Sequence, residues 1–143
     1  MTFQLTPGSA TLEQLERIWR EGLAVSLGED ARTAIDAAAH AVKKAAAGDA
    51  AVYGVNTGFG KLASVRIKPT DTAKLQRNLI LSHCCGVGEP LDVKTTRLMM
   101  VLKLLSVGRG ASGIHWETIE LLQTLLASGI TPLIPTQGSV GAS

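Results

Sequence analysis

The sequence predicts a mainly α-helical chain that forms part of a larger helical bundle, and three observations lead to this prediction. Hydrophobic residues make up 45% of the 143 residues and charged residues 18%, a composition typical of a globular chain with a core to bury. Apolar residues recur at helical spacing in segments with recognisable start and stop signals. These segments are apolar around too much of their circumference for surface helices, so we expect other helices to cover them.

The first two helices have clear boundaries. The stretch TLEQ at residues 11–14 matches a capping box, in which the threonine and the glutamine each satisfy a free backbone N–H group of the other. The helix that follows should end near Gly22. A second helix is expected over residues 29–47 because alanine, the best helix former, dominates it, and Gly48 is a suitable C-terminal cap.

A short strand and loop region is predicted around residues 49–69. The segment DAAVYGVN at 49–56 is too short and too rich in β-branched residues for another helix, so we expect a strand or an extended segment there. The segment TGFGKLASVRIKP at 57–69 has no helical period and is expected to form a loop.

Three further helices complete the predicted fold. Thr70 is expected to cap the first of them, which carries an apolar stripe and stops at the turn signals that begin with Gly86. The next helix is expected over residues 91–107 and the last over residues 115–128, before Gly129.

Charge, hydropathy and cysteine usage exclude several classes of protein. The net charge of +2 comes from scattered lysines and arginines, whereas nucleic-acid binding needs clustered cations. No signal peptide is recognisable, and the most apolar segment is interrupted by Lys103 and too short to span a bilayer. Cys84 and Cys85 are adjacent, which suits neither a disulfide nor a metal-binding pair, and no histidines have the spacing of a metal site. We therefore expect a cytoplasmic protein with no metal, nucleic acid or membrane partner.

Two glycine-rich segments match a dinucleotide-binding pattern only in their letters. GFGKLA at 58–63 is not followed directly by a helix, and no acidic residue lies near position 80. GRGASG at 108–113 follows a predicted helix and is most simply a turn between two helices.

Three features have both a structural and a functional interpretation. Tyr53 could pack its ring and hydrogen-bond its hydroxyl, or it could act as an acid or base beside the glycine-rich loop. His83 could cap a helix C-terminus, or it could contact a substrate. The segment GSVGAS at 138–143 could be a flexible tail or the start of a serine nucleophile turn.

Three blocks of sequence together resemble the histidine and aromatic amino acid ammonia-lyases. They are AVYGVNTGFGKLAS at 51–64, LSHCCGVGEPL at 81–91 and IPTQGSVGAS at 134–143, in the order and with the separations of that family. Members of the family have several hundred residues. The resemblance therefore implies that residues 1–143 are the N-terminal catalytic portion of a larger lyase subunit, ending inside its Ala-Ser-Gly triplet.

The resemblance also implies a cofactor and a set of site residues. In the family the triplet cyclises to a 4-methylidene-imidazol-5-one (MIO) group, an electrophile that no ordinary side chain provides. Ala142 and Ser143 match its first two members, and the glycine that should follow is absent from this chain. Tyr53 matches a tyrosine thought to take the β-proton of the substrate, and Gly60 matches a position that lines the substrate pocket.

The pair Ser82-His83 occupies the position that distinguishes the branches of the family. Histidine lyases carry Ser-His there, whereas phenylalanine lyases usually carry Phe-Leu and tyrosine lyases His-Leu. Asn56 also matches the histidine branch, where the phenylalanine branch tends to have threonine. The resemblance thus implies that Ser82 and His83 bind the substrate, and that His83 contacts the imidazole or assists proton transfer.

The implied activity is conversion of L-histidine to trans-urocanate and ammonia by a homotetramer whose active sites collect loops from several subunits. One alternative is a tyrosine or phenylalanine ammonia-lyase, or an aminomutase, of the same family. The other is a truncated, non-catalytic subunit that serves as a helical interaction partner.

Overall fold

The computed structural model describes residues 2–138, and this part of the chain is mainly α-helical, as predicted. The helices are α1 (Leu12–Glu21), α2 (Asp30–Ala47), α3 (Thr72–His83), α4 (Val93–Val107) and α5 (Trp116–Ala127), with short 3-10 helices η1 (Gly60–Leu62) and η2 (Pro69–Asp71). The strands are β1 (Thr2–Leu5), β2 (Ala24–Leu27), β3 (Val87–Pro90) and β4 (Pro135–Gln137).

The chain divides into two compact units. The first unit comprises the residues up to His40 together with Pro90–Ile134. The second comprises Ala41–Glu89 together with the residues from Pro135 onward.

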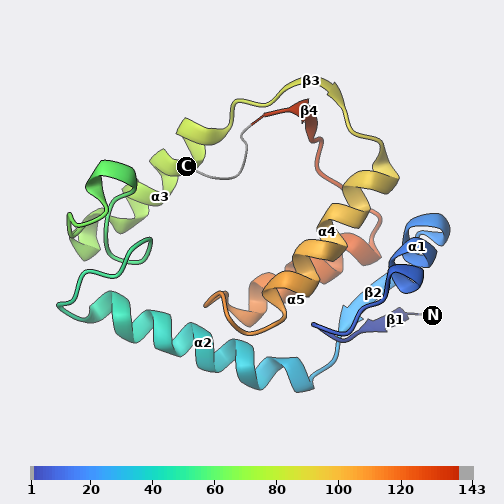
Figure 1. The fold of residues 1–143 in the computed structure, drawn as a ribbon, viewed down its shortest axis with the longest axis horizontal. Coiled ribbons are helices and arrows are strands. Elements are labelled where there is room, and N and C mark those ends of the chain that lie inside the picture. The colour runs from blue at the N-terminus through green and yellow to red at the C-terminus, as the bar shows by residue number, and fades with distance from the viewer. Residues whose placement is uncertain (1, 139–143) are drawn as a thin grey trace. The chain divides into compact units, whose positions relative to one another are not determined.

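The first unit is a small α/β core. Strands β1 and β2 pair in parallel, from Thr2 opposite Ala24 to Leu5 opposite Leu27, with α1 as the connection between them. In Figure 1, α4 and α5 lie side by side, and both pack against β2 while α1 packs against α4. The most deeply buried side chains of this core are Leu5, Ile18, Val25, Ile35, Val101, Leu104, Ile119 and Leu126.

The boundaries of α1 confirm the capping prediction. The Thr11 hydroxyl accepts a hydrogen bond from the backbone N–H of Gln14 at 3.2 Å, and the Gln14 side chain accepts one from the Thr11 N–H at 3.0 Å. Gly22 ends the helix with a left-handed φ of 64°, a conformation that glycine adopts without strain. The other helices also lie within a few residues of their predicted ranges.

Two predictions within residues 49–72 are wrong, one of a strand and one of a helix cap. Residues 49–56 form bends and turns rather than a strand, and the region contributes only one isolated bridge, between Thr57 and Arg66. Its β-branched residues lack a second extended segment with which to pair. Thr70 does not cap a helix but lies within η2, since the fixed φ of Pro69 starts a helical turn there.

A charged side chain is part of the core of the first unit. Arg97 is 9% exposed, and its two terminal nitrogens donate hydrogen bonds to the carbonyl oxygens of Leu126 and Leu23, each at 2.6 Å. These bonds join α4 to the C-terminal end of α5 and to the residue that precedes β2. Within residues 2–138, no helix combines the length and the hydrophobicity needed to cross a membrane.

Candidate active site

The residues predicted to form a site come from three segments of the second unit. Tyr53 and Gly60 lie in the loop between α2 and α3, and Ser82 and His83 form the C-terminal end of α3. The third segment begins with β4. Ala142 and Ser143 lie outside the described residues.

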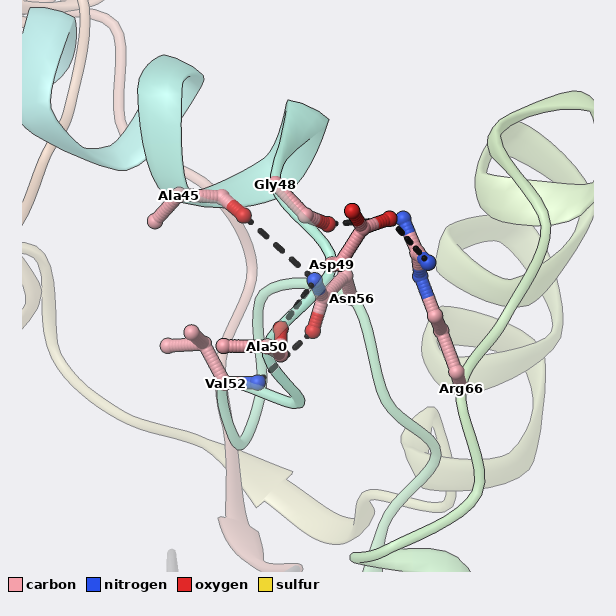
Figure 2. Close-up of polar contacts among 7 residues, drawn as sticks. All are labelled: Ala45, Gly48, Asp49, Ala50, Val52, Asn56 and Arg66. Atoms are coloured by element: carbon pink, nitrogen blue, oxygen red, sulfur yellow. Dashed lines mark hydrogen bonds and ion pairs between the residues drawn. The ribbon is translucent and has the colours of Figure 1, made fainter.

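A buried carboxamide organises the loop that follows α2, as Figure 2 shows. Asn56 is only 4% exposed. Its Oδ1 accepts a hydrogen bond from the N–H of Val52 at 2.7 Å. Its Nδ2 donates to the carbonyl of Ala50 at 2.9 Å and, more weakly, to that of Ala45 in α2 at 3.4 Å. The turn is thereby tied to the last turn of the helix.

A guanidinium closes the base of the same loop (Figure 2). Arg66 donates to the Asp49 carboxylate at 3.1 Å and to the Gly48 carbonyl at 2.6 Å, so it bridges to the residues just after α2. Main-chain bonds support this closure: the N–H of Ile67 donates to the Asn56 carbonyl at 2.8 Å. The two ends of the loop are therefore fastened to one place.

Tyr53 projects from the turn that Asn56 holds. Within this turn Tyr53 is followed by Gly54, whose φ of 74° lies in the left-handed region that favours glycine. The Tyr53 ring packs edge to face against Phe59, with ring centroids 5.8 Å apart. Tyr53 is 57% exposed, and its hydroxyl has no hydrogen-bond partner among residues 2–138. One side of the ring is therefore held by Phe59, while more than half of the side chain is exposed.

Gly60 leaves open space beside the loop. It begins η1 with a φ of 58°, and a Cβ added there would meet no atom within 4 Å. Gly58 differs, because a Cβ there would lie 2.5 Å from the Cβ of Leu62. Gly58 is needed for packing of the loop, whereas Gly60 provides an unfilled surface.

The pair at the end of α3 is linked by hydrogen bonds. The Ser82 hydroxyl donates to the Leu79 carbonyl at 3.0 Å, and His83 Nδ1 lies 2.8 Å from the same oxygen. A carbonyl oxygen only accepts, so His83 Nδ1 must carry the proton in this arrangement. This leaves Nε2 as the ring nitrogen that is directed away from the helix end, and both side chains are exposed.

Two glycines allow β4 to lie against the segment that follows His83. Strands β3 and β4 pair, and a Cβ on Gly86 would lie 2.8 Å from the Pro135 ring. A Cβ on Gly88 would lie 2.8 Å from the Thr136 hydroxyl. A Cβ added to Gly138, just beyond β4, would lie 3.5 Å from the Gly86 Cα, an ordinary van der Waals distance. The structure thus brings the described start of the third segment next to the end of the second.

The structure does not join all the predicted residues directly. Among residues 2–138, neither a hydrogen bond nor a ring contact links Tyr53 to Ser82 or His83. The same residues contain no cluster of three or more His, Cys, Asp or Glu side chains suited to a metal ion. Sequence reasoning gave Arg66 no role, and it used Asn56 only as a mark of resemblance. The presence of an asparagine just before the glycine-rich loop was the one sequence signal that could have indicated the role of Asn56 in holding the turn.

Comparisons with known proteins agree on one family. The profile of the aromatic amino acid lyase family matches residues 10–143. The chain is 68% identical over all its residues to a histidine ammonia-lyase of Roseobacter denitrificans and covers 28% of that protein.

Solved structures extend this similarity. The histidine ammonia-lyase of Trypanosoma cruzi matches 99% of the chain with a TM-score of 0.86 and 35% identity. The tyrosine aminomutase of Streptomyces globisporus matches 99% of it with a TM-score of 0.90 and 26% identity. The chain covers 27% of each of these structures, so it spans little more than a quarter of the length of its relatives.

Proposed function

The chain belongs to the aromatic amino acid lyase family, and on this basis we propose that it is the N-terminal part of an enzyme that converts L-histidine to trans-urocanate and ammonia. The observation that carries the proposal is the 68% identity to a histidine ammonia-lyase over the whole chain. The pair Ser82-His83, at the position where the branches of the family differ, supports the choice of substrate.

The prosthetic group of the family is proposed for this chain as well. We propose that Ala142, Ser143 and a following glycine form the MIO group, which would supply the electrophile that makes the amino group of the substrate a leaving group. The pairing of β4 with β3 supports this assignment, because it places the chain just before the triplet beside the segment that follows His83.

Tyr53 is the proposed base for the β-proton. Its hydroxyl is unpaired among residues 2–138, and its ring is held by Phe59, so the oxygen can be presented to a substrate in a defined position.

His83 is the proposed contact for the substrate ring. Its Nε2 lone pair can accept the N–H of an imidazole while Nδ1 stays bonded to the Leu79 carbonyl. Ser82 holds the same carbonyl and limits rotation of the pair. Gly60 offers a surface with no side chain on which substrate can lie.

The direct test is turnover of histidine, tyrosine and phenylalanine by the purified full-length protein. We expect histidine to give the highest kcat/KM. Its turnover is measured as urocanate release, and turnover of the other two amino acids as ammonia release. Preference for tyrosine or phenylalanine, or formation of a β-amino acid, would instead support a sister lyase or an aminomutase. Peptide mass spectrometry tests the prosthetic group separately: we expect loss of two waters across the segment after Val140. An unmodified Ala-Ser with no turnover would support a non-catalytic interaction subunit.

We further propose a cytoplasmic homotetramer with active sites shared between subunits, as the family resemblance implies. Exposed apolar side chains beside the Ser82-His83 pair support a covering partner, since Ile80 is 67% exposed and Leu81 is 58% exposed. Light scattering of the full-length protein should give four times the subunit mass.

A further inference from the structure

We propose that Asn56 is a positioning residue, whose buried carboxamide locks the turn that carries Tyr53 onto the C-terminal end of α2. The inference rests on the proposed function, because it assigns Asn56 an effect on catalysis through Tyr53. Asn56 itself is buried and offers no atom to a substrate, so it differs from the residues of the site.

The hydrogen bonds of Asn56 close the turn on both sides of Tyr53. Its side-chain oxygen accepts from the N–H of Val52 at 2.7 Å, while its own N–H donates to the Val52 carbonyl at 3.2 Å. Tyr53 is the first residue inside this closed ring. A shift of Asn56 would therefore move the backbone from which the tyrosine ring projects.

The same side chain ties the turn to α2. Nδ2 uses both of its hydrogens, one on Ala50 at 2.9 Å and one on Ala45 at 3.4 Å. Ala45 lies in the last turn of α2, and its carbonyl also accepts a hydrogen bond from the N–H of Gly48 at 3.2 Å. The carboxamide adds a second, longer bond to this carbonyl and thereby links the turn to the end of the helix.

Only an asparagine matches this set of partners. An aspartate of the same size would keep the bond to Val52 but would set a negative charge against two carbonyl oxygens. Serine and threonine have one donor each, and glutamine is longer by a methylene at a position that is 4% exposed. The hydrogen-bond partners and the burial of this position therefore require asparagine.

Arg66 provides a second and separate attachment. It donates to Asp49 and to the Gly48 carbonyl, which precede the turn in the chain, and its side chain makes no hydrogen bond to residues 52–56. Loss of Arg66 should loosen the base of the loop but leave the closed turn around Tyr53 in place. The two residues can be separated by experiment.

The test uses steady-state kinetics of the full-length enzyme with a double-mutant cycle. Asn56→Ala should lower kcat about 10- to 100-fold, the range expected when a catalytic group is misplaced, with KM for histidine within about twofold. In a Tyr53→Phe background, Asn56→Ala should change kcat by less than about twofold, because Asn56 acts through the hydroxyl that is already missing. Asn56→Ser serves in the same cycle if the alanine variant does not fold.

Two further measurements exclude a merely structural role. Deuterium at the β-carbon of histidine should slow Asn56→Ala more than wild type, because proton removal becomes more rate-limiting. Amide exchange of residues 50–56 should also be faster. Ile119→Val, a core change in α5, should lower the melting temperature but leave kcat and the isotope effect unchanged.

Full additivity in the cycle, or an unchanged kcat in Asn56→Ala, would refute the role of Asn56. These results are distinct from failure of the proposed function, which would show as a wild-type enzyme that does not release urocanate from histidine.

Discussion

Arg97 shows how a single charged side chain can be accommodated in an apolar core. A guanidinium stays charged at any relevant pH, so its burial must be compensated by hydrogen bonds. Two carbonyl oxygens at 2.6 Å supply them, and one belongs to Leu126 near the C-terminus of α5, where the helix dipole is negative. Its Nε has no partner among residues 2–138.

This arrangement predicts that Arg97 cannot be replaced by another cation. Arg97→Lys keeps the charge, but one ammonium group has no planar fork with which to reach both carbonyls. We expect each polar group left without its partner to cost about 1–3 kcal/mol, seen as a lower melting temperature of the full-length protein. Lys103, an exposed cation of the same helix, offers the control, because Lys103→Arg should leave the melting temperature unchanged.

At this scale the sequence identifies chemistry better than geometry. Tyr53, Ser82 and His83 can be selected from their motifs, and the proposal retains all three. The bonds of Asn56 were not predictable, because its partners include a helix end eleven residues earlier. The burial of Arg97 was also hidden, since its acceptors are backbone carbonyls from residues 29 and 74 positions away.

Helix α4 begins at a capping aspartate that titrates. The Asp92 carboxylate accepts hydrogen bonds from the Thr95 hydroxyl at 2.5 Å and from the Thr95 N–H at 2.9 Å. The hydroxyl bond is the main cause that lowers the pKa of Asp92 below its ordinary value of 3.8. A lowered folded-state pKa stabilises the folded protein above the unfolded-state value, and this contribution is lost as the pH falls through the folded-state pKa.

We therefore expect Asp92→Asn to change how the melting temperature depends on pH in the acid range. Asparagine is also a good N-cap but does not titrate, so wild type should exceed the variant in melting temperature at about pH 7 and lose that advantage as the pH falls below 3.8, the ordinary pKa of the carboxyl group. Thermal unfolding followed by circular dichroism across this range checks the result. An advantage for wild type that is constant at every pH would contradict it.

The turn between α4 and α5 depends on a glycine at a crowded position. Gly110 has a φ of 70°, and a Cβ added there would lie 2.6 Å from the Cβ of Ala34 in α2. Gly129 has a φ of 69° but no atom within 4 Å of an added Cβ. An alanine at either position would have a strained backbone, but only at position 110 would it also clash with a neighbouring side chain.

Gly110→Ala should therefore destabilise the protein more than Gly129→Ala. Both variants incur about 1–2 kcal/mol from the left-handed backbone, and Gly110→Ala adds about 1–3 kcal/mol from overpacking against α2. Melting temperatures of the two full-length variants give the comparison. Equal losses would mean that α2 shifts freely away from this turn.

Elements with local signals were predictable, and elements that depend on distant partners were not. The capping box and the terminal glycine of α1 lie within one short segment. Strands β1 and β2 have four residues each and pair with each other across α1, so neither has a strong pattern alone. At residues 49–56 a strand was predicted where none forms, and the cause is the same. The strand-forming residues there have no partner strand, and they form bends and a turn.

At the scale of the whole molecule, the chain exposes apolar surface in both units. In the first unit Val93 is 65%, Leu121 is 58% and Leu133 is 72% exposed. An apolar hollow of about 260 Å³ is lined on α4 and α5 by residues that include Leu121 and Leu125. Surface of this kind marks a site that another part of a protein covers. If the chain is the N-terminal part of a longer enzyme, as proposed, the remainder of that polypeptide is the expected cover, since the chain matches only 28% of its histidine ammonia-lyase relative.

A polypeptide limited to residues 1–143 is therefore expected to self-associate. Its exposed apolar side chains should bind a hydrophobic dye and cause concentration-dependent light scattering, whereas the full-length protein should show neither. Replacing Leu121 and Leu133 with glutamine in the short polypeptide should reduce dye binding, because both side chains lie on the exposed surface and contribute nothing to the buried core. The same replacements in the full-length protein should lower its melting temperature, since there they would be covered. A short polypeptide that stays monomeric and binds no dye would show that these two units are complete without a cover.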